Sequence, residues 1–252
     1  MRNFLLGLLI LCGLQVFGET VKKVFVGSDG TSIPYSLQIP ETVQSGEKYP
    51  LVLCLHGAGG RGTDNVARSS ESFKTLNSPA VQRCHPSFLL APQCPEGEQW
   101  VDTPWAEGSY DLSAVPIGNE LKTVLELLTE VRSEFAVDAS RIYAAGLSMG
   151  GYGTWDLIMR KPDLFAAAIP VCGAGDPSQA SRLRDLSLWV FHGDIDPVVP
   201  VQGSREMVDA LKKAGNENVR YTEFPGVKHG AWTPAWREPK LVEWLFLQRK
   251  IY

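Results

Sequence analysis

The chain has 252 residues, of which 44% are hydrophobic and 21% are charged, and its formal net charge at pH 7 is −4. This composition is typical of a soluble globular protein and excludes a collagen-like or low-complexity chain. Because the charge is mildly negative, the sequence argues against nucleic acid and anionic lipid as partners, and we expect a small or uncharged partner.

The first 18 residues predict a secretory signal peptide. A positively charged start is followed by an apolar run, residues 4–14, and by small residues near Gly18. This is the pattern of a cleaved signal, and the run is too short to span a bilayer as a stop-transfer helix. We therefore expect a secreted or periplasmic mature chain that is not bound to a membrane. Residues 19–252 contain no linker or internal repeat, so we expect them to form a single domain.

Two alternating segments, Val21–Val26 and Ile33–Ile39, predict strands joined by a turn. Continuous apolar runs farther along predict buried strands. These runs cover residues 51–55, 88–91, 142–145, 165–171, 186–191 and 219–224. Segments with helical period lie at 119–135, 152–159, 204–213 and 239–248. Strands that alternate with helices predict an α/β fold, with a mostly parallel sheet of about eight strands and helices on both faces.

Four cysteines follow the predicted signal peptide. Cys84 and Cys94 flank a predicted strand that would hold them roughly 20 Å apart, beyond the limit of about 7 Å between disulfide Cα atoms. We therefore expect no disulfide between these two. Cys54 and Cys172 lie in or beside apolar runs, where a thiol usually serves as a small buried hydrophobe.

The segment Gly146-Leu147-Ser148-Met149-Gly150 places a serine between a predicted strand and a predicted helix. A strand-to-helix turn this sharp leaves no room for side chains beside the serine, which explains the glycines. The hydroxyl of Ser148 is then exposed at the carboxyl end of a strand, where ligands of parallel sheets bind. The backbone N–H of Met149, at the positive end of the helix, can stabilise a developing oxyanion. The pattern predicts a nucleophilic serine.

A serine nucleophile needs a base, and the base needs an orienting carboxylate. The loop after the run 186–191 contains Asp194 and Asp196, and the loop after the run 219–224 contains His229. Both loops follow strands, so they are expected at the same edge of the sheet as Ser148. The chain order Ser, Asp, His is the one that accompanies this serine motif.

With these motifs the chain resembles the α/β-hydrolase superfamily and, within it, the small secreted esterases grouped with polyhydroxybutyrate-depolymerase-like, feruloyl-esterase-like and predicted-peptidase proteins. Four motifs carry the resemblance over nearly all of the mature chain: Leu55-His56-Gly57-Ala58-Gly59-Gly60, Gly146–Gly150, His192–Pro200 and His229-Gly230-Ala231-Trp232. The resemblance implies the α/β-hydrolase fold. It implies that Asp196 is the triad acid and that Asp194 shapes the loop. It also implies that the N–H of Ala58 is the second oxyanion donor, with the N–H of Gly59 as the alternative.

The remaining histidines carry no predicted chemistry. His56 and His192 both precede glycine at strand ends, and we interpret them as loop-shaping residues bonded to nearby backbone. His85 receives no role. No residue spacing suggests a metal site, and the glycines at 57–62 lack the lysine of a phosphate loop, so no cofactor is predicted.

These roles predict carboxylic ester hydrolysis through a covalent acyl-enzyme. His229, oriented by Asp196, would take the proton of Ser148 as it attacks the acyl carbonyl of a small-molecule or polymer-linked ester. A secreted serine peptidase would use identical residues, and a non-catalytic binding protein of this fold is a further alternative. The esterase is favoured, because no extra domain is recognised that would filter peptides.

Three tryptophans are predicted to contact the substrate. Trp100 and Trp105 lie in a modest excursion of the chain between Pro92 and Pro116, and Trp232 lies three residues after His229. Aromatic walls bind flat acyl groups or sugar rings. With no long helical cap to cover an extended chain, we expect short or aromatic acyl esters rather than long lipids.

Overall fold

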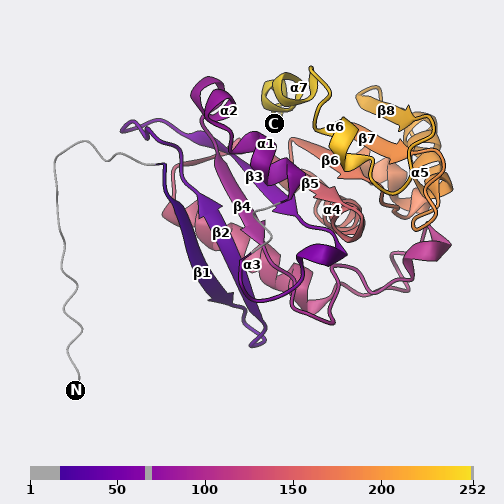
Figure 1. Cartoon of the computed structure of the whole chain (residues 1–252), viewed down its shortest axis with the longest axis horizontal. Coiled ribbons are helices and arrows are strands. Elements are labelled where there is room, and N and C mark those ends of the chain that lie inside the picture. The colour runs from indigo at the N-terminus through magenta and orange to yellow at the C-terminus, as the bar shows by residue number, and fades with distance from the viewer. Residues whose placement is uncertain (1–17, 66–69, 251–252) are drawn as a thin grey trace.

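The computed structural model describes residues 18–65 and 70–250, which form one layered α/β structure (Figure 1). The predicted signal peptide, except for Gly18, lies outside the described residues. Eight strands form one sheet in the order β1-β2-β4-β3-β5-β6-β7-β8. The strands are β1 (Thr20–Val26), β2 (Ser32–Gln38), β3 (Tyr49–Leu55), β4 (Phe88–Pro92), β5 (Val137–Leu147), β6 (Ala167–Val171), β7 (Ser187–Gly193) and β8 (Val219–Phe224).

The sheet is antiparallel at one edge and parallel elsewhere. β1 pairs with β2, and β2 with β4, in antiparallel fashion. β4, β3, β5, β6, β7 and β8 are parallel neighbours. The predicted mostly parallel sheet is therefore confirmed, and the carboxyl ends of six strands meet at one edge, where loops from distant parts of the sequence come together.

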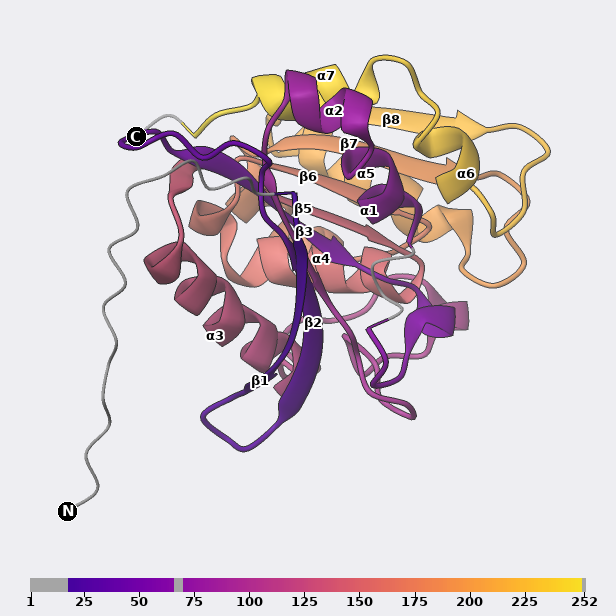
Figure 2. The same ribbon diagram turned by 60° about the vertical axis from the view of Figure 1, so that its left-hand side comes forward.

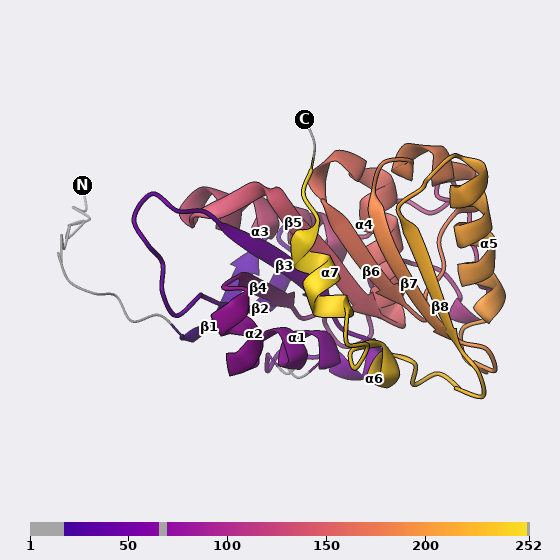
Figure 3. The ribbon, with the colours of Figure 1, turned by 90° about the horizontal axis from the view of Figure 1, so that it is seen from above.

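Helices cover both faces of the sheet, as Figures 2 and 3 show from two further directions. α3 (Asn119–Glu134), α4 (Met149–Arg160) and α5 (Val201–Lys213) lie on one face. α1 (Glu71–Leu76), α2 (Pro79–Cys84), α6 (Trp232–Ala235) and α7 (Leu241–Leu247) lie on the other. Short 3-10 helices are η1 (Ala58–Gly60), η3 (Trp105–Glu107), η4 (Pro162–Leu164) and η5 (Pro177–Leu183). Among the described residues, none of the helices has the length and apolar character needed to cross a bilayer.

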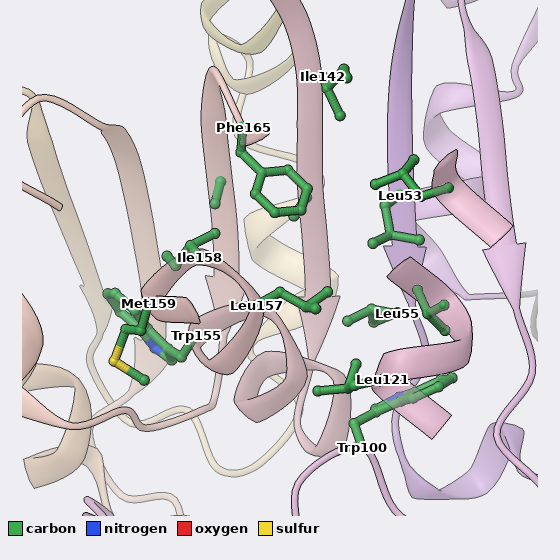
Figure 4. Packing of buried hydrophobic residues seen from close by; sticks show 14 of the residues in the cluster. Leu53, Leu55, Trp100, Leu121, Ile142, Trp155, Leu157, Ile158, Met159 and Phe165 are labelled. Atoms are coloured by element: carbon green, nitrogen blue, oxygen red, sulfur yellow. The ribbon is translucent and has the colours of Figure 1, made fainter. Parts of the chain in front are cut away.

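The central strand β3 shows why the chain has two core layers. Its side chains alternate between the faces, so Leu53 and Leu55 pack with α3 and α4, whereas Val52 and Cys54 pack with α1 and α7. Figure 4 shows the first of these layers, which includes Leu157 of α4. A strand buried on both faces needs a continuous apolar run, which is what its sequence contains.

Several features differ from the sequence prediction, and the larger ones concern two element starts and two short helices. β5 begins at Val137 instead of residue 142, and α4 begins at Met149 instead of residue 152. The helices α1 and α2, with six residues each, had not been predicted. The four described cysteines, Cys54, Cys84, Cys94 and Cys172, are free thiols.

Candidate active site

Ser148 occupies the junction between β5, which ends at Leu147, and α4, which begins at Met149. Its φ of 53° and ψ of −120° are strained for a residue with a side chain. The N–H of Ser148 donates to the carbonyl of Val171 at 2.8 Å, which anchors the turn to β6. The serine is therefore held in a costly conformation by its neighbours, an arrangement typical of functional sites.

Close backbone contacts explain the glycines around Ser148. A Cβ on Gly146 would lie 2.1 Å from the carbonyl oxygen of Gly150, and a Cβ on Gly150 would lie 2.2 Å from the carbonyl oxygen of Leu55. Both clashes are with backbone, which cannot move aside as a flexible side chain can. Helix α4 can therefore begin directly against β3 and β5 only with glycine at both positions.

A chain of two hydrogen bonds runs from Ser148 into the loops after β7 and β8. Ser148 Oγ lies 2.8 Å from His229 Nε2, and His229 Nδ1 lies 2.7 Å from Asp196 Oδ2. Because the carboxylate can only accept, Nδ1 carries the proton and Nε2 accepts from the serine hydroxyl. The structure thus brings together the three residues predicted as nucleophile, base and acid.

Asp196 is shielded from solvent and fully bonded. Its Oδ1 accepts from the backbone N–H groups of Val198 at 2.9 Å and Val199 at 3.0 Å. Its Oδ2 lies 2.7 Å from His229 Nδ1 and 3.3 Å from His192 Nε2. Burial alone would raise the pKa of Asp196, but the hydrogen bonds from His192, His229 and these backbone groups hold it well below its usual range. The carboxylate is therefore ionised at neutral pH.

Asp194 has a different position in the same loop. Its Oδ1 accepts from the N–H of Gly226 at 2.7 Å, which ties the loop after β7 to the loop after β8. This bond shapes the turn that presents His229. Asp196, rather than Asp194, is the carboxylate that contacts the imidazole.

A cavity of about 430 Å³ lies in front of Ser148 and His229. Trp105 and Trp232 form part of its wall, and the ring of Trp232 meets the ring of His229 edge to face, with centroids 5.3 Å apart. The other lining residues are His56, Gly57, Ala58, Gly59, Gly60, Ser70, Glu71, Leu147 and Val198. The cavity is thus an aromatic-walled space next to the serine hydroxyl.

Trp100 does not reach this cavity. Its side chain is fully buried, and its Nε1 donates to the carbonyl of His56 at 3.0 Å. It packs in the core layer of Leu55 and Leu121 (Figure 4). The predicted substrate contact of Trp100 is therefore corrected to a packing role, because its ring points into the core instead of out of the excursion.

Ala58 and Met149, the predicted oxyanion donors, flank Ser148. Ala58 begins η1 and lines the cavity, and Met149 is the first residue of α4, where backbone N–H groups lack helical partners. His56 supports the loop that contains Ala58. The His56 Nε2 accepts from the N–H of Cys94 at 2.9 Å, and Nδ1 donates to the carbonyl of Gly57 at 2.7 Å. Burial lowers the pKa of His56 to about 4, so this imidazole is neutral.

Gln93, which sequence reasoning missed, supports the same loop. This fully buried side chain donates from Nε2 to the carbonyl of Gly60 at 3.0 Å, and its Oε1 accepts from the N–H of Asn65 at 2.6 Å. The only signal in the sequence is a polar residue directly after an apolar strand. That signal is too common to identify a loop support.

Three potential metal ligands, Cys172, His192 and Asp196, have donor atoms within 4.8 Å of one another among the described residues. Two of the three already use these atoms in the hydrogen bonds of the Asp196 carboxylate. Burial raises the pKa of the Cys172 thiol to about 12, so it is not the thiolate that binds metals. The residues present fit a hydrogen-bonded cluster better than a metal centre.

Comparison with known proteins agrees with this geometry. A protein named "probable feruloyl esterase C" from Aspergillus terreus is 29% identical over 178 residues, which make up 69% of this chain and 59% of that protein. A poly(3-hydroxyoctanoate) depolymerase from Pseudomonas fluorescens is 30% identical over 154 residues, 55% of this chain and 52% of the other. The chain therefore spans little more than half the length of these relatives.

A crystal structure described as that of a thermostable esterase superposes with a TM-score of 0.85 at 40% identity, covering 93% of this chain and 64% of the other. The family model for phospholipases and carboxylesterases matches residues 38–237. This match covers the serine turn, the Asp196 loop and His229. The chain therefore belongs to the phospholipase/carboxylesterase family, a family of carboxylic ester hydrolases with the α/β-hydrolase fold.

Proposed function

We propose that the protein hydrolyses carboxylic esters with Ser148 as nucleophile, His229 as general base and acid, and Asp196 as the orienting carboxylate. The observation that carries the proposal is the pair of hydrogen bonds of 2.8 Å and 2.7 Å that joins the three side chains. Ser148 also faces a cavity large enough for a small acyl group.

The reaction follows from the positions of the protons. Ser148 Oγ attacks the acyl carbonyl while its proton moves to His229 Nε2, and Asp196 stabilises the imidazolium that forms. The N–H groups of Ala58 and Met149 stabilise the oxyanion. The alcohol then leaves with the proton from Nε2. Water attacks the acyl-enzyme by the same route and releases the acid and the free serine.

The cavity wall favours short-chain or aromatic acyl esters. Trp105 and Trp232 provide flat apolar surfaces beside the serine hydroxyl. The names of the relatives include a feruloyl esterase and a polyester depolymerase, so an ester joined to a polymer is a reasonable natural substrate. A secreted serine peptidase remains the second candidate, because it would use the same hydrogen-bonded side chains.

We also propose that the protein is exported and that cleavage after Gly18 leaves Glu19 as the first residue. The basis is the positively charged start and apolar run of residues 1–18. Expression with the natural leader and sequencing of the exported product test this. A product beginning at Glu19 is expected, whereas retention of Met1 in exported protein would contradict cleavage.

A substrate panel separates esterase from peptidase. Purified protein is given nitrophenyl acetate, butyrate and palmitate, methyl ferulate, an acetylated xylo-oligosaccharide and a peptide nitroanilide, with Ser148→Ala as the control for contaminating hydrolases. We expect turnover of acetate and butyrate above palmitate and none of the anilide. Faster hydrolysis of the anilide than of every ester would favour the peptidase, and a preference for palmitate would contradict the proposed cleft.

A further inference from the structure

The imidazole of His192 lies against the carboxylate of Asp196, the proposed acid of the triad. Its Nε2 is 3.3 Å from Asp196 Oδ2, the same oxygen that accepts from His229. We propose that His192 is a positioning residue of the Ser148–His229–Asp196 triad, and that its Nε2–H fixes the carboxylate in the rotation that presents Oδ2 to His229. This inference rests on the proposed esterase function and deepens it.

The position of the ring proton follows from its partners. His192 Nε2 also lies 3.1 Å from the carbonyl oxygen of Val199. Both neighbours of Nε2 are acceptors without hydrogen, so Nε2 must be the protonated, donating nitrogen. One N–H is thus shared between the loop backbone and the triad carboxylate, and His192 differs in this from a histidine that only shapes a loop.

The imidazole of His192 is itself held firmly. Its side chain is fully buried, and Nδ1 lies 2.8 Å from Ser204 Oγ at the start of α5. Ser204 Oγ in turn lies 3.1 Å from the carbonyl oxygen of Gly173, to which it can donate. A support that extends from β7 through α5 to the loop after β6 therefore fixes the direction of Nε2.

Counting hydrogen bonds shows what His192 adds. A carboxylate has about four lone-pair sites. In Asp196 two backbone N–H groups bond to Oδ1, His229 Nδ1–H bonds to Oδ2, and His192 Nε2 faces the same Oδ2 at 3.3 Å. Without His192 one site is empty, so the carboxylate can rotate and becomes more basic. Rotation weakens the alignment with the imidazolium of His229 that forms during the reaction and so lowers kcat. The more basic carboxylate holds that imidazolium more strongly, which moves the acidic side of the activity profile to higher pH.

The nearby titratable groups do not change charge over the pH range of the activity profile. Burial raises the pKa of Cys172 to about 12 and also raises that of Tyr152 above its usual range. A hydrogen bond from Arg205 lowers the pKa of Glu223 to about 2. These groups keep one protonation state between pH 5 and 9. A shift of the acidic side of the pH–activity profile therefore reports a change among His192, His229 and Asp196.

Two isosteric substitutions test the proposal. In His192→Gln the amide nitrogen can take the place of Nε2, whereas in His192→Asn the amide reaches only the place of Nδ1. Steady-state kinetics with nitrophenyl butyrate should show kcat lowered by about tenfold or more in His192→Asn, with KM unchanged, as for other outer hydrogen-bond partners of a catalytic group. His192→Gln should recover most of kcat. The pH of half-maximal kcat/KM should move upward in His192→Asn only.

Equal kcat and equal pH profiles in wild type and a folded His192→Asn would overturn the inference while leaving the esterase proposal intact. An inactive wild type would instead defeat the esterase proposal. Adding Asp196→Asn to each variant checks the route of the effect. The loss of kcat caused by His192→Asn should largely disappear when residue 196 is already asparagine. An equal loss of kcat in both backgrounds would contradict action through Asp196.

A measurement on the wild-type protein covers the case in which His192→Asn does not fold. Spectra of protein labelled with ¹⁵N-histidine report which ring nitrogen of His192 carries the proton. A protonated Nε2 whose resonance shifts in Asp196→Asn is expected. An unprotonated Nε2 at neutral pH would overturn the proposal, because it could not donate to the carboxylate.

Discussion

The dipeptide His-Gly occurs at the carboxyl ends of two parallel strands of this protein. Directly after β3, the buried imidazole of His56 bonds to backbone groups of Cys94 and Gly57. At the end of β7, the buried imidazole of His192 bonds to the Val199 carbonyl and also reaches the carboxylate of Asp196. One histidine therefore supports the loop of the proposed oxyanion donor Ala58, and the other supports the proposed acid. The same local motif serves two different parts of one site.

The largest loss of activity is expected from substitution of Ser148. The proposed oxyanion donor after β3 and the proposed acid after β7 both serve the reaction of Ser148, so Ser148→Ala removes the contribution of both to turnover. We expect kcat/KM for nitrophenyl butyrate to fall by about 10⁴-fold or more, with an unchanged circular dichroism spectrum. A folded Ser148→Ala variant with near-normal activity would show that neither loop belongs to the active site.

The next largest effect separates the two carboxylates of the β7 loop. Asp196→Asn should lower kcat by about 10³- to 10⁴-fold, because an amide cannot hold the required tautomer of His229. Asp194→Asn is the matched control, since its amide oxygen can still accept from the N–H of Gly226. Its kcat should stay within a few-fold of wild type. The reverse ranking would transfer the role of acid to Asp194.

The pH profile of activity sharpens the comparison of the histidines. Burial lowers the pKa of His56 to about 4, and the pKa of Asp196 lies below its usual range, so neither changes charge between pH 5 and 8. Activity should therefore fall about tenfold per pH unit on the acidic side, through a single step in which the proposed base is protonated. Rates measured on nitrophenyl butyrate that stay flat from pH 5 to 8 would argue against a histidine base.

The pH dependence of stability, unlike that of activity, should depend on His56 in the loop after β3. Because the folded protein lowers the pKa of His56 from about 6.5 to about 4, the unfolded chain binds the proton more readily between these values. The contribution of His56 is complete above pH 6.5 and is lost as the pH falls toward 4, by about 3 kcal/mol. Urea unfolding at several pH values should show a smaller loss in His56→Asn. Equal losses in both proteins would contradict a buried neutral His56.

The smallest effect is expected at the cavity wall. Trp232→Ala should raise KM for nitrophenyl butyrate by about three- to tenfold and change kcat little, if the ring binds substrate and transition state equally. Trp232→Phe keeps an aromatic face beside His229 and should remain close to wild type. Unchanged KM in Trp232→Ala would remove this ring from the proposed substrate contacts.

Strongly apolar strands and glycine-bounded turns were predictable. The core of β5 was identified from the run at Ile142, but its first residues were missed because Asp138 and Ser140 are polar. In the structure Ser140 donates to the Asp138 carboxylate, which also accepts from Arg141. The start of α4 was missed because Gly150 and Gly151 obscure the helical pattern. Short helices such as α1 carry too few residues to show a period.

The directions of side chains were the main feature of the site that the sequence could not predict. Ser148 and His229 were assigned from strand ends and chain order, and the family resemblance implied Asp196 instead of Asp194. The structure brings Ser148, Asp196 and His229 together. Trp100 was assigned to the cleft from its place in the excursion, yet its ring is buried. Nothing in the sequence states which way a loop tryptophan points. The contact of His192 with Asp196 likewise depends on a loop conformation that the motif does not reveal.

The central claim, that Ser148 attacks the acyl carbonyl, is tested most directly by trapping the acyl-enzyme. Wild-type protein is mixed with excess nitrophenyl acetate, quenched in acid within milliseconds and analysed by intact-protein and peptide mass spectrometry. The account predicts one acetyl group, located on the peptide and side chain of Ser148 and absent from Ser148→Ala. Acetylation of another residue with kinetics that match turnover, such as the exposed thiol of Cys84, would contradict it.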